Sequence, residues 1–206
     1  MTYLVRHPGE IGWRLLQHLE ITAIALVVAL AIALPLGVAA ARNERLRGPV
    51  LGVLGVIYTL PSLAVFALLV PAFGLGLVTT EIALVAYAQM ILVRSIVTGL
   101  LGVPAAMTDA ARGLGMSAWQ TLYRVELPQA LPVILGGVRL AAVATISIAT
   151  LAGKIDAGGI GTLLFAGLDN DDPSRIFAGS AAAALLAIAA DLTLRAFERY
   201  ARARAN

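Results

Sequence analysis

The sequence predicts an all-α integral membrane protein with about five transmembrane helices, and three observations lead to this fold class. Apolar residues make up 60% of the chain and charged residues only 13%, more apolar surface than a soluble domain of 206 residues could bury. Several charge-free runs are long enough to cross a bilayer as helices. The basic residues gather in short segments between these runs, which the positive-inside rule explains better than nucleic-acid binding does. We therefore expect a lipid bilayer as the surrounding solvent and no nucleic-acid partner.

The first element expected is an N-terminal interfacial segment, residues 1–20, with a short helix at 8–20 lying on the membrane. Its scattered charges exclude a signal-peptide core. The two histidines, His7 and His18, lack metal-ligand company and are expected at the surface. The first span is expected at 21–41, kinked at Pro35, and the sequence RNERLR at 42–47 reads as a cytoplasmic loop.

The next charge-free run extends from residue 48 to residue 80, which is too long for one helix and too short for two. We divide it into a second span at about 50–70 and an outer turn at 71–79, where proline and glycines break the helix. The third span follows at about 80–101, with Glu81 near its outer end and Arg94 in its inner half.

The fourth span is expected at about 130–152, with Arg139 near the inner surface, where it can snorkel or pair. The glycine-rich and acidic stretch that follows is an outer loop, in which 158–167 is a candidate re-entrant segment. A fifth span at about 175–195 closes a single transmembrane domain, 21–196, and a basic tail occupies 197–206.

The distribution of arginine predicts the orientation, with the N-terminus outside and the C-terminus in the cytoplasm of a bacterial inner membrane. Three stretches (42–48, 102–129 and 195–206) then face inward. They hold nine of the fifteen basic residues: Arg42, Arg45, Arg47, Arg112, Arg124, Arg195, Arg199, Arg202 and Arg204.

The tract between the third and fourth spans, 104–128, predicts an elbow of two short helices. Asp109 is placed to open the first helix, and Ala110 and Ala111 favour helix without bulk. Gly115 permits a left-handed residue where that helix stops. Ser117 can cap a second helix at 118–125, in which Trp119, Leu122 and Tyr123 share one face. Pro128 is expected to end this helix.

The same tract contains Asp-Ala-Ala at 109–111, Gly115, and Val-x-Leu-Pro at 125–128. This pattern resembles the cytoplasmic signature of bacterial ABC-importer permeases, Glu-Ala-Ala-x3-Gly-x9-Ile-x-Leu-Pro. The resemblance, to the methionine-importer-like superfamily, implies a type I ABC-importer permease fold whose elbow docks on the ATPase. It implies coupling roles for seven residues: Asp109, Ala110, Ala111, Gly115, Trp119, Leu127 and Pro128. The alternative is an amphipathic loop lying on the membrane surface.

Two further tracts, 57–76 and 149–168, resemble segments of the osmoprotectant permeases for glycine betaine, carnitine and choline. Lys154 and Asp156 depart from that pattern, which is mostly apolar there; they could pair with each other or face the binding protein. Residues of the second span are candidates to line the pathway, with ordinary helix packing as the alternative reading. They are Tyr58, Thr59, Pro61, Ser62 and Phe66.

The chain lacks the GxxxxGK[ST] nucleotide-binding motif, the HExxH and GxSxG motifs, and any cysteine. We therefore expect no catalytic, cofactor or metal site, with ATP and Mg²⁺ bound by a partner. The resemblance implies two copies of an ATPase subunit, a second permease subunit, identical or homologous, and an extracytoplasmic solute-binding protein.

Other functions remain open at this stage. Within the family, the substrate could be an amino acid or another zwitterion. From another class, the chain could be a proton-coupled transporter using Asp191 or Glu81, or a non-conducting assembly subunit, although five spans without a visible repeat suit a secondary transporter badly. Asp191 is expected to pair with an arginine or to lie at the interface rather than to mark a proton path.

Overall fold

A computed structural model describes residues 3 and 6–205 of the chain, and for residues 201–205 it describes the backbone alone. Within these residues the secondary structure is helical, without strands. The helices are α2 (Pro8–Arg42), α3 (Glu44–Thr59), α4 (Ser62–Phe73), α5 (Leu77–Leu101), α6 (Ala105–Gly113), α7 (Ala118–Thr121), the π-turn η1 (Leu122–Glu126), α8 (Leu127–Leu151), the 3-10 turn η2 (Ala152–Ile155), α9 (Ile160–Asp169) and α10 (Pro173–Ala205).

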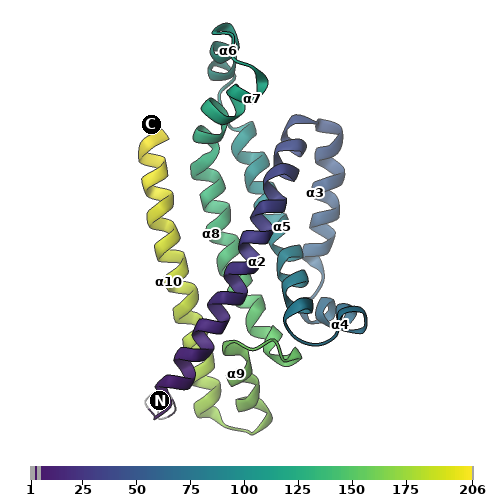
Figure 1. Ribbon diagram of the computed structural model, residues 1–206, viewed down its shortest axis with the longest axis vertical. Helices are drawn as coiled ribbons and strands as arrows, with labels where there is room; N and C mark the ends of the chain where they lie inside the picture. Colours follow the sequence, from purple (N-terminus) through teal and green to yellow (C-terminus); the bar gives the residue numbers. More distant parts are fainter. Residues whose placement is uncertain (1–2, 4–5, 206) are drawn as a thin grey trace.

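The long helices form a bundle with α5 and α8 at its centre, α2 across them and α10 against α8 (Figure 1). In the part of the chain that is described, four helical segments are long and apolar enough to cross a membrane: α2, α5, α10 and the continuous segment from α7 through α8 to η2. A fifth crossing comes from α3 and α4 if this bent pair counts as one span. The all-α membrane fold with four to five spans matches the expectation.

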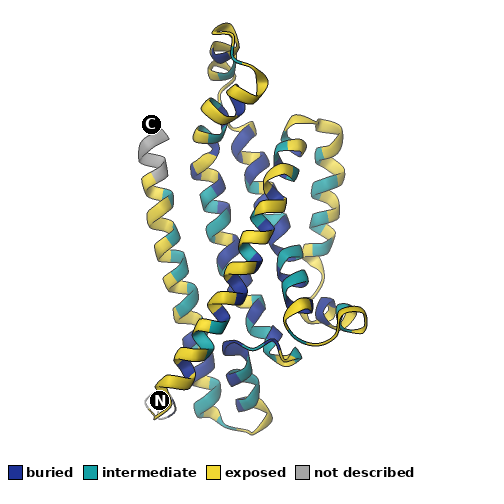
Figure 2. Ribbon diagram, viewed as in Figure 1, coloured by how far each residue is buried: buried dark blue, intermediate teal, exposed yellow. Residues whose placement is uncertain are grey.

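Small residues let the central helices approach closely. The buried face of α2 carries Ala25, Ala29, Ala33 and Gly37, spaced four residues apart. A Cβ at Gly37 would lie 2.7 Å from the side chain of Ile96 on α5, so only glycine fits there. Membrane helices associate through such packing, since lipid provides no hydrophobic drive between them. Many large apolar side chains are accordingly exposed, and exposed positions recur along the long helices (Figure 2).

The expected interfacial helix at 8–20 is wrong as a separate element. Helix α2 runs without interruption from Pro8 to Arg42, through Pro35. Pro8 occupies the first turn, where a missing N–H costs nothing, and an interior proline is tolerated in membrane helices because neighbouring groups satisfy the freed carbonyl.

The expectation that His18 lies at the surface is also wrong, because its side chain is fully buried. Its Nε2 lies 3.0 Å from the carbonyl oxygen of Ile146 on α8, and its Nδ1 accepts a hydrogen bond from the Ile160 N–H at 3.3 Å. A neutral ring protonated on Nε2 satisfies both contacts, and it joins α2, α8 and α9. His7 is exposed, as expected, and stacks on the ring of Tyr3.

The expected loop at 42–47 and the straight second span at 50–70 both need correction. Helices α2 and α3 are separated by Asn43 alone, whose side chain caps α3 by accepting from the Arg45 N–H at 3.0 Å. The second span is broken at Leu60 and Pro61, and α4 turns away from α3 by 96°. A residue before proline is driven to extended geometry, and Leu60 has a ψ of 139°.

The outer segments also differ in detail from expectation. Helix α4 continues through Pro71 to Phe73, so the turn into α5 is shorter than 71–79 and uses Gly74 and Gly76 at φ of +80° and +103°. The candidate re-entrant stretch at 158–167 overlaps α9, whose buried Ile160 and Leu163 pack with Ile11 of α2 and with α10.

Lys154 pairs with Asp169 at 3.1 Å and not with Asp156. Helix α10 continues through the expected tail as far as Ala205, and the side chains of Arg202 and Arg204 lie outside the description.

The connecting segments and the chain ends lie at two opposite ends of the bundle. The elbow, the α2–α3 junction and the C-terminus lie at one end, whereas α4, α9 and the N-terminal part of α2 lie at the other (Figure 1). The three arginine-rich stretches of the sequence therefore share one end of the molecule.

Candidate functional site

Helices α6 and α7 project beyond the other helices at the arginine-rich end, and their surfaces are mostly exposed (Figures 1 and 2). Asp109 does not open the first elbow helix as expected, because α6 begins four residues earlier, after Pro104. Pro104 is extended and its carbonyl accepts the first helical bond, from Met107. Asp109 instead lies on the exposed surface of α6. Its Oδ1 is 3.4 Å from the Nη1 of Arg112, whose side chain is also exposed.

The turn after α6 has the predicted left-handed residue. Gly115 has a φ of +77°, its N–H donates to the Arg112 carbonyl, and the Met116 N–H donates to that of Ala111. This pair of bonds is a Schellman motif, which satisfies the last carbonyls of a helix and reverses the chain. Of the two alanines, Ala111 is buried and Ala110 is exposed, so only one is available at the tip for close contact with another surface.

Ser117 caps the second elbow helix through a capping box with Gln120, as its position suggested. Trp119 and Tyr123 form an edge-to-face pair with ring centroids 4.9 Å apart, and both are exposed. Leu122, on the same helical face by spacing, is instead buried in the core of the bundle. The elbow thus offers aromatic surface outward and is anchored inward.

Pro128 does not end the second elbow helix, contrary to expectation. The helix passes through the π-turn η1 into α8, where Pro128 occupies the first turn. A proline is tolerated at that position, and the wider π-turn resets the backbone bonding before it. Leu127 packs against the core cluster around α5. Helix α7, the π-turn η1 and α8 are therefore one continuous helical body that leads from the elbow into the bundle.

An ion pair that the sequence reading missed ties this body to α2. The Arg42 Nη2 lies 2.6 Å from the Glu126 Oε2, and the Glu126 side chain is only 7% exposed. Arg47 donates to the carbonyls of Ala40 and Ala41, which closes the end of α2. The available signal was Glu126 itself, an isolated acid between the apolar Val125 and Leu127.

The candidate pathway residues do not form one group. Tyr58 and Thr59 end α3, Pro61 lies in the bend, Ser62 begins α4, and Phe66 is 1% exposed. Phe66 packs with Val65, Ala83 and Tyr87 in a core cluster, so ordinary packing describes it in this structure.

Tyr58 reaches a cavity of about 380 Å³ between four helices, α3, α5, α8 and α10. The cavity is lined by Tyr58, Ile91, Leu140, Val143, Ala144 and Asp191. Asp191 pairs with Arg139 on α8, with Oδ1 and Nη1 2.7 Å apart, and the Arg139 Nε donates to Glu198 at 3.1 Å. The expectation that Asp191 and Arg139 find partners is therefore met.

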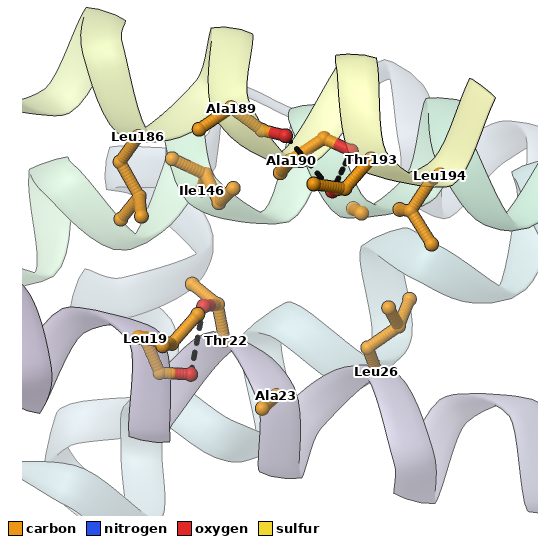
Figure 3. Close-up of a pocket in the computed structure, with 11 residues that line it drawn as sticks. Leu19, Thr22, Ala23, Leu26, Ile146, Leu186, Ala189, Ala190, Thr193 and Leu194 are labelled. Atoms are coloured by element: carbon orange, nitrogen blue, oxygen red, sulfur yellow. Dashed lines mark hydrogen bonds between the residues drawn. The ribbon is translucent and has the colours of Figure 1, made fainter. Parts of the chain in front are cut away.

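A second hollow, of about 310 Å³, lies between α2, α8 and α10 and has almost purely apolar walls (Figure 3). Its hydroxyls belong to Thr22 and Thr193, and both donate to carbonyls of their own helices. Both hydroxyls in the lining of this hollow are therefore already hydrogen-bonded, and its walls suit contact with hydrocarbon chains rather than with a polar solute. Within the described residues, no group of three or more His, Asp or Glu side chains is placed to hold a metal ion.

Comparison with known proteins agrees with this geometry. The profile of the family described as "Binding-protein-dependent transport system inner membrane component" matches residues 33–205. "Glycine betaine/carnitine/choline transport system permease protein OpuCB" of Bacillus subtilis (strain 168) is 37% identical over 199 residues, which cover 97% of this chain and 92% of that protein. "Osmoprotectant import permease protein OsmW" of Salmonella typhimurium is 39% identical over 197 residues, covering 93% and 92%.

Among solved structures, the "Crystal structure of an amino acid ABC transporter with histidines" superposes with a TM-score of 0.79. It covers 97% of both chains at 17% sequence identity, so it supports the fold and carries no argument about substrate. Helical spans, an exposed elbow and these relatives point to the same kind of molecule.

Proposed function

This chain belongs to the family of binding-protein-dependent transport system inner membrane components, and we propose that it imports a quaternary amine used as a compatible solute. As a member of that family it is a multi-pass inner-membrane permease of the ABC-importer class. The proposed substrates are glycine betaine, carnitine and choline. The observation that carries this proposal is the identity of 37% over nearly the whole chain with a permease named for those three solutes.

We propose an orientation with the N-terminus outside and the C-terminus in the cytoplasm. The elbow, the α2–α3 junction and the C-terminus share one end of the bundle, and these segments hold most of the arginines. Basic segments are retained in the cytoplasm. The end with α4 and α9 would then meet the solute-binding protein.

Permeases of this class work with an ATPase and a binding protein. We propose a complex of two copies of the ATPase, this permease with an identical or homologous second permease, and one extracytoplasmic binding protein. ATP and Mg²⁺ would bind on the ATPase, since this chain has no phosphate-binding loop. The elbow residues Asp109, Ala110, Gly115 and Trp119 would dock on that subunit. Ala111 is buried on α6, and Leu127 and Pro128 form the first turn of α8, through which the elbow joins the membrane span.

Two alternatives have less support. An amino acid or another zwitterion stays the second candidate, because the sequence motifs do not separate the substrates of these permeases. A proton-coupled mechanism through Asp191 or Glu81, or a subunit without a pathway, is disfavoured by the family and by the pairing of Asp191 with Arg139.

The proposed substrate is tested by uptake. The chain and its partner subunits are supplied to cells that lack their own osmoprotectant importers, and radiolabelled choline, glycine betaine, carnitine and methionine are compared. We expect ATP-dependent accumulation of at least one quaternary amine. Accumulation of methionine alone would move the assignment to the amino-acid alternative.

Reversal of charge at the elbow tip should weaken the ATPase contact. Asp109→Lys replaces an exposed acid that already lies near Arg112, so the folded chain should lose little stability. Less ATPase should remain bound to the purified permease, and the deficit should grow at low salt, where exposed charges act most strongly. Equal recovery of the ATPase with both proteins would remove Asp109 from the docking surface.

A further inference from the structure

The cavity between α3, α5, α8 and α10 combines one acid, one aromatic ring and aliphatic walls. We propose that it is a transport subsite for the quaternary ammonium group of the substrate, an inference that rests on the proposed function. In this subsite the Asp191 carboxylate and the Tyr58 ring face the positive charge, and Ile91, Leu140 and Val143 face the methyl groups.

The carboxylate is held in place and still has an oxygen to offer. Asp191 uses Oδ1 for the hydrogen bond to the Arg139 Nη1 at 2.7 Å. Among the side chains that the structure describes, the second oxygen of Asp191 makes no hydrogen bond, and a third of this side chain is exposed. Acids within membrane helices are costly and mark ion or substrate pathways. Arg139 therefore fixes Asp191 and does not itself line the cavity.

The aromatic ring is also positioned by its neighbours. The Tyr58 ring is half-exposed and meets the ring of Tyr87 edge-on, with centroids 6.2 Å apart. The Tyr87 hydroxyl donates to the carbonyl of Leu60 at 2.6 Å, which fixes this pair of rings at the bend between α3 and α4. A ring face supplies cation–π attraction to a quaternary ammonium group.

The rest of the lining selects this cation chemistry over others. A quaternary ammonium ion donates no hydrogen bonds, so it needs charge, ring faces and apolar surface rather than several oxygen ligands. Hard metal cations need six or more oxygens, which these aliphatic walls do not provide. At about 380 Å³ the cavity is in the size range of small-molecule sites.

The test compares two pairs of variants in the complete importer, with the binding protein saturated with [14C]choline. Tyr58→Leu removes the ring, whereas Tyr58→Phe keeps it. Asp191→Asn removes the acid that lines the cavity. Glu198→Gln removes the second carboxylate that pairs with Arg139, and Glu198 does not line the cavity. Assembly with the ATPase is measured for every variant.

We expect Tyr58→Leu and Asp191→Asn to lower the maximal uptake rate about fivefold or more, given the strength of a desolvated cation–π contact. Tyr58→Phe should transport several times faster than Tyr58→Leu, and Glu198→Gln should stay within about twofold of wild type. The importer purified without its binding protein should bind [14C]choline, and Tyr58→Leu should bind less.

Three results would overturn the subsite. One is uptake by Tyr58→Leu at the wild-type rate, and another is equal losses in Tyr58→Leu and Tyr58→Phe. The third is an equal loss in Asp191→Asn and Glu198→Gln, which would assign Asp191 to the ion network alone. Absence of uptake of any quaternary amine by the wild-type importer would overturn the proposed function together with the subsite.

Discussion

Gly115→Val is expected to leave the chain inserted in the membrane and to uncouple uptake from ATP hydrolysis. Gly115 has a φ of +77°, and a β-branched residue strongly disfavours that region. The cost of such strain is about 1–3 kcal/mol, and about 1.4 kcal/mol corresponds to a factor of ten in population. The bent elbow should therefore lose its geometry in much of the population, and uptake should fall about tenfold.

The expected defect of Gly115→Val comes from the backbone conformation and not from a steric clash, so two closely related variants can serve as controls. An ideal Cβ at Gly115 has no atom within 4 Å, and the same holds at Gly113, which lies two residues earlier in α6 without a positive φ. Gly113→Val should therefore transport nearly normally. Gly115→Asn should recover most of the activity, because asparagine tolerates the left-handed region. Normal uptake by Gly115→Val, or an equal defect in Gly113→Val, would contradict the role of this turn.

Glu126→Arg is expected to have the largest effect on the stability of the protein and to abolish most transport. Glu126 is nearly buried and lies 2.6 Å from Arg42, so the substitution places two cations together where α2 meets the elbow. Loss of one partner of a buried pair costs 3–5 kcal/mol; we expect about 2–3 kcal/mol because Arg42 remains partly exposed. The thermal unfolding midpoint in detergent and the uptake rate should both fall.

The pair can be tested by exchange. Arg42→Glu combined with Glu126→Arg restores opposite charges and should recover a large part of both readouts, a coupling that a double-mutant cycle measures. Asp109→Lys is the matched control for stability, because its pair with Arg112 is exposed and should add little. If the exchange recovered nothing, the contact between Arg42 and Glu126 would not be what holds the elbow to α2.

The sequence predicted the structure correctly where the local chemistry of a residue determines its position. Gly115 and Ser117 occupy the turn and the cap that their chemistry demands, and charge-free runs mark the apolar helices. It failed for His18, whose burial depends on one carbonyl and one amide N–H that lie more than 120 residues away in the chain. No local pattern reports such partners.

Helix ends were the other weak point. Pro71 and Pro128 both suggested a helix end, yet each lies inside a continuous helix, whereas Pro61 marks a 96° break. A proline stops a membrane helix only when the surrounding helices do not satisfy the freed carbonyl. The cavity shared by Tyr58 and Asp191 likewise joins residues 133 positions apart (191 − 58), which only the packed bundle brings to one place.

The proposal that the elbow meets the ATPase is tested most directly by cross-linking from its tip. The chain has no cysteine, so Leu114→Cys introduces a single thiol at a side chain that is 80% exposed. Asn170→Cys, exposed at the other end of the bundle, is the control. In native membranes treated with a thiol-to-amine cross-linker, we expect the Leu114→Cys chain to form an adduct with an ATPase that contains a phosphate-binding loop, and the Asn170→Cys chain to form none with it. Adducts from both positions, or an elbow thiol that never captures an ATPase, would contradict the assignment of this tract as the coupling elbow.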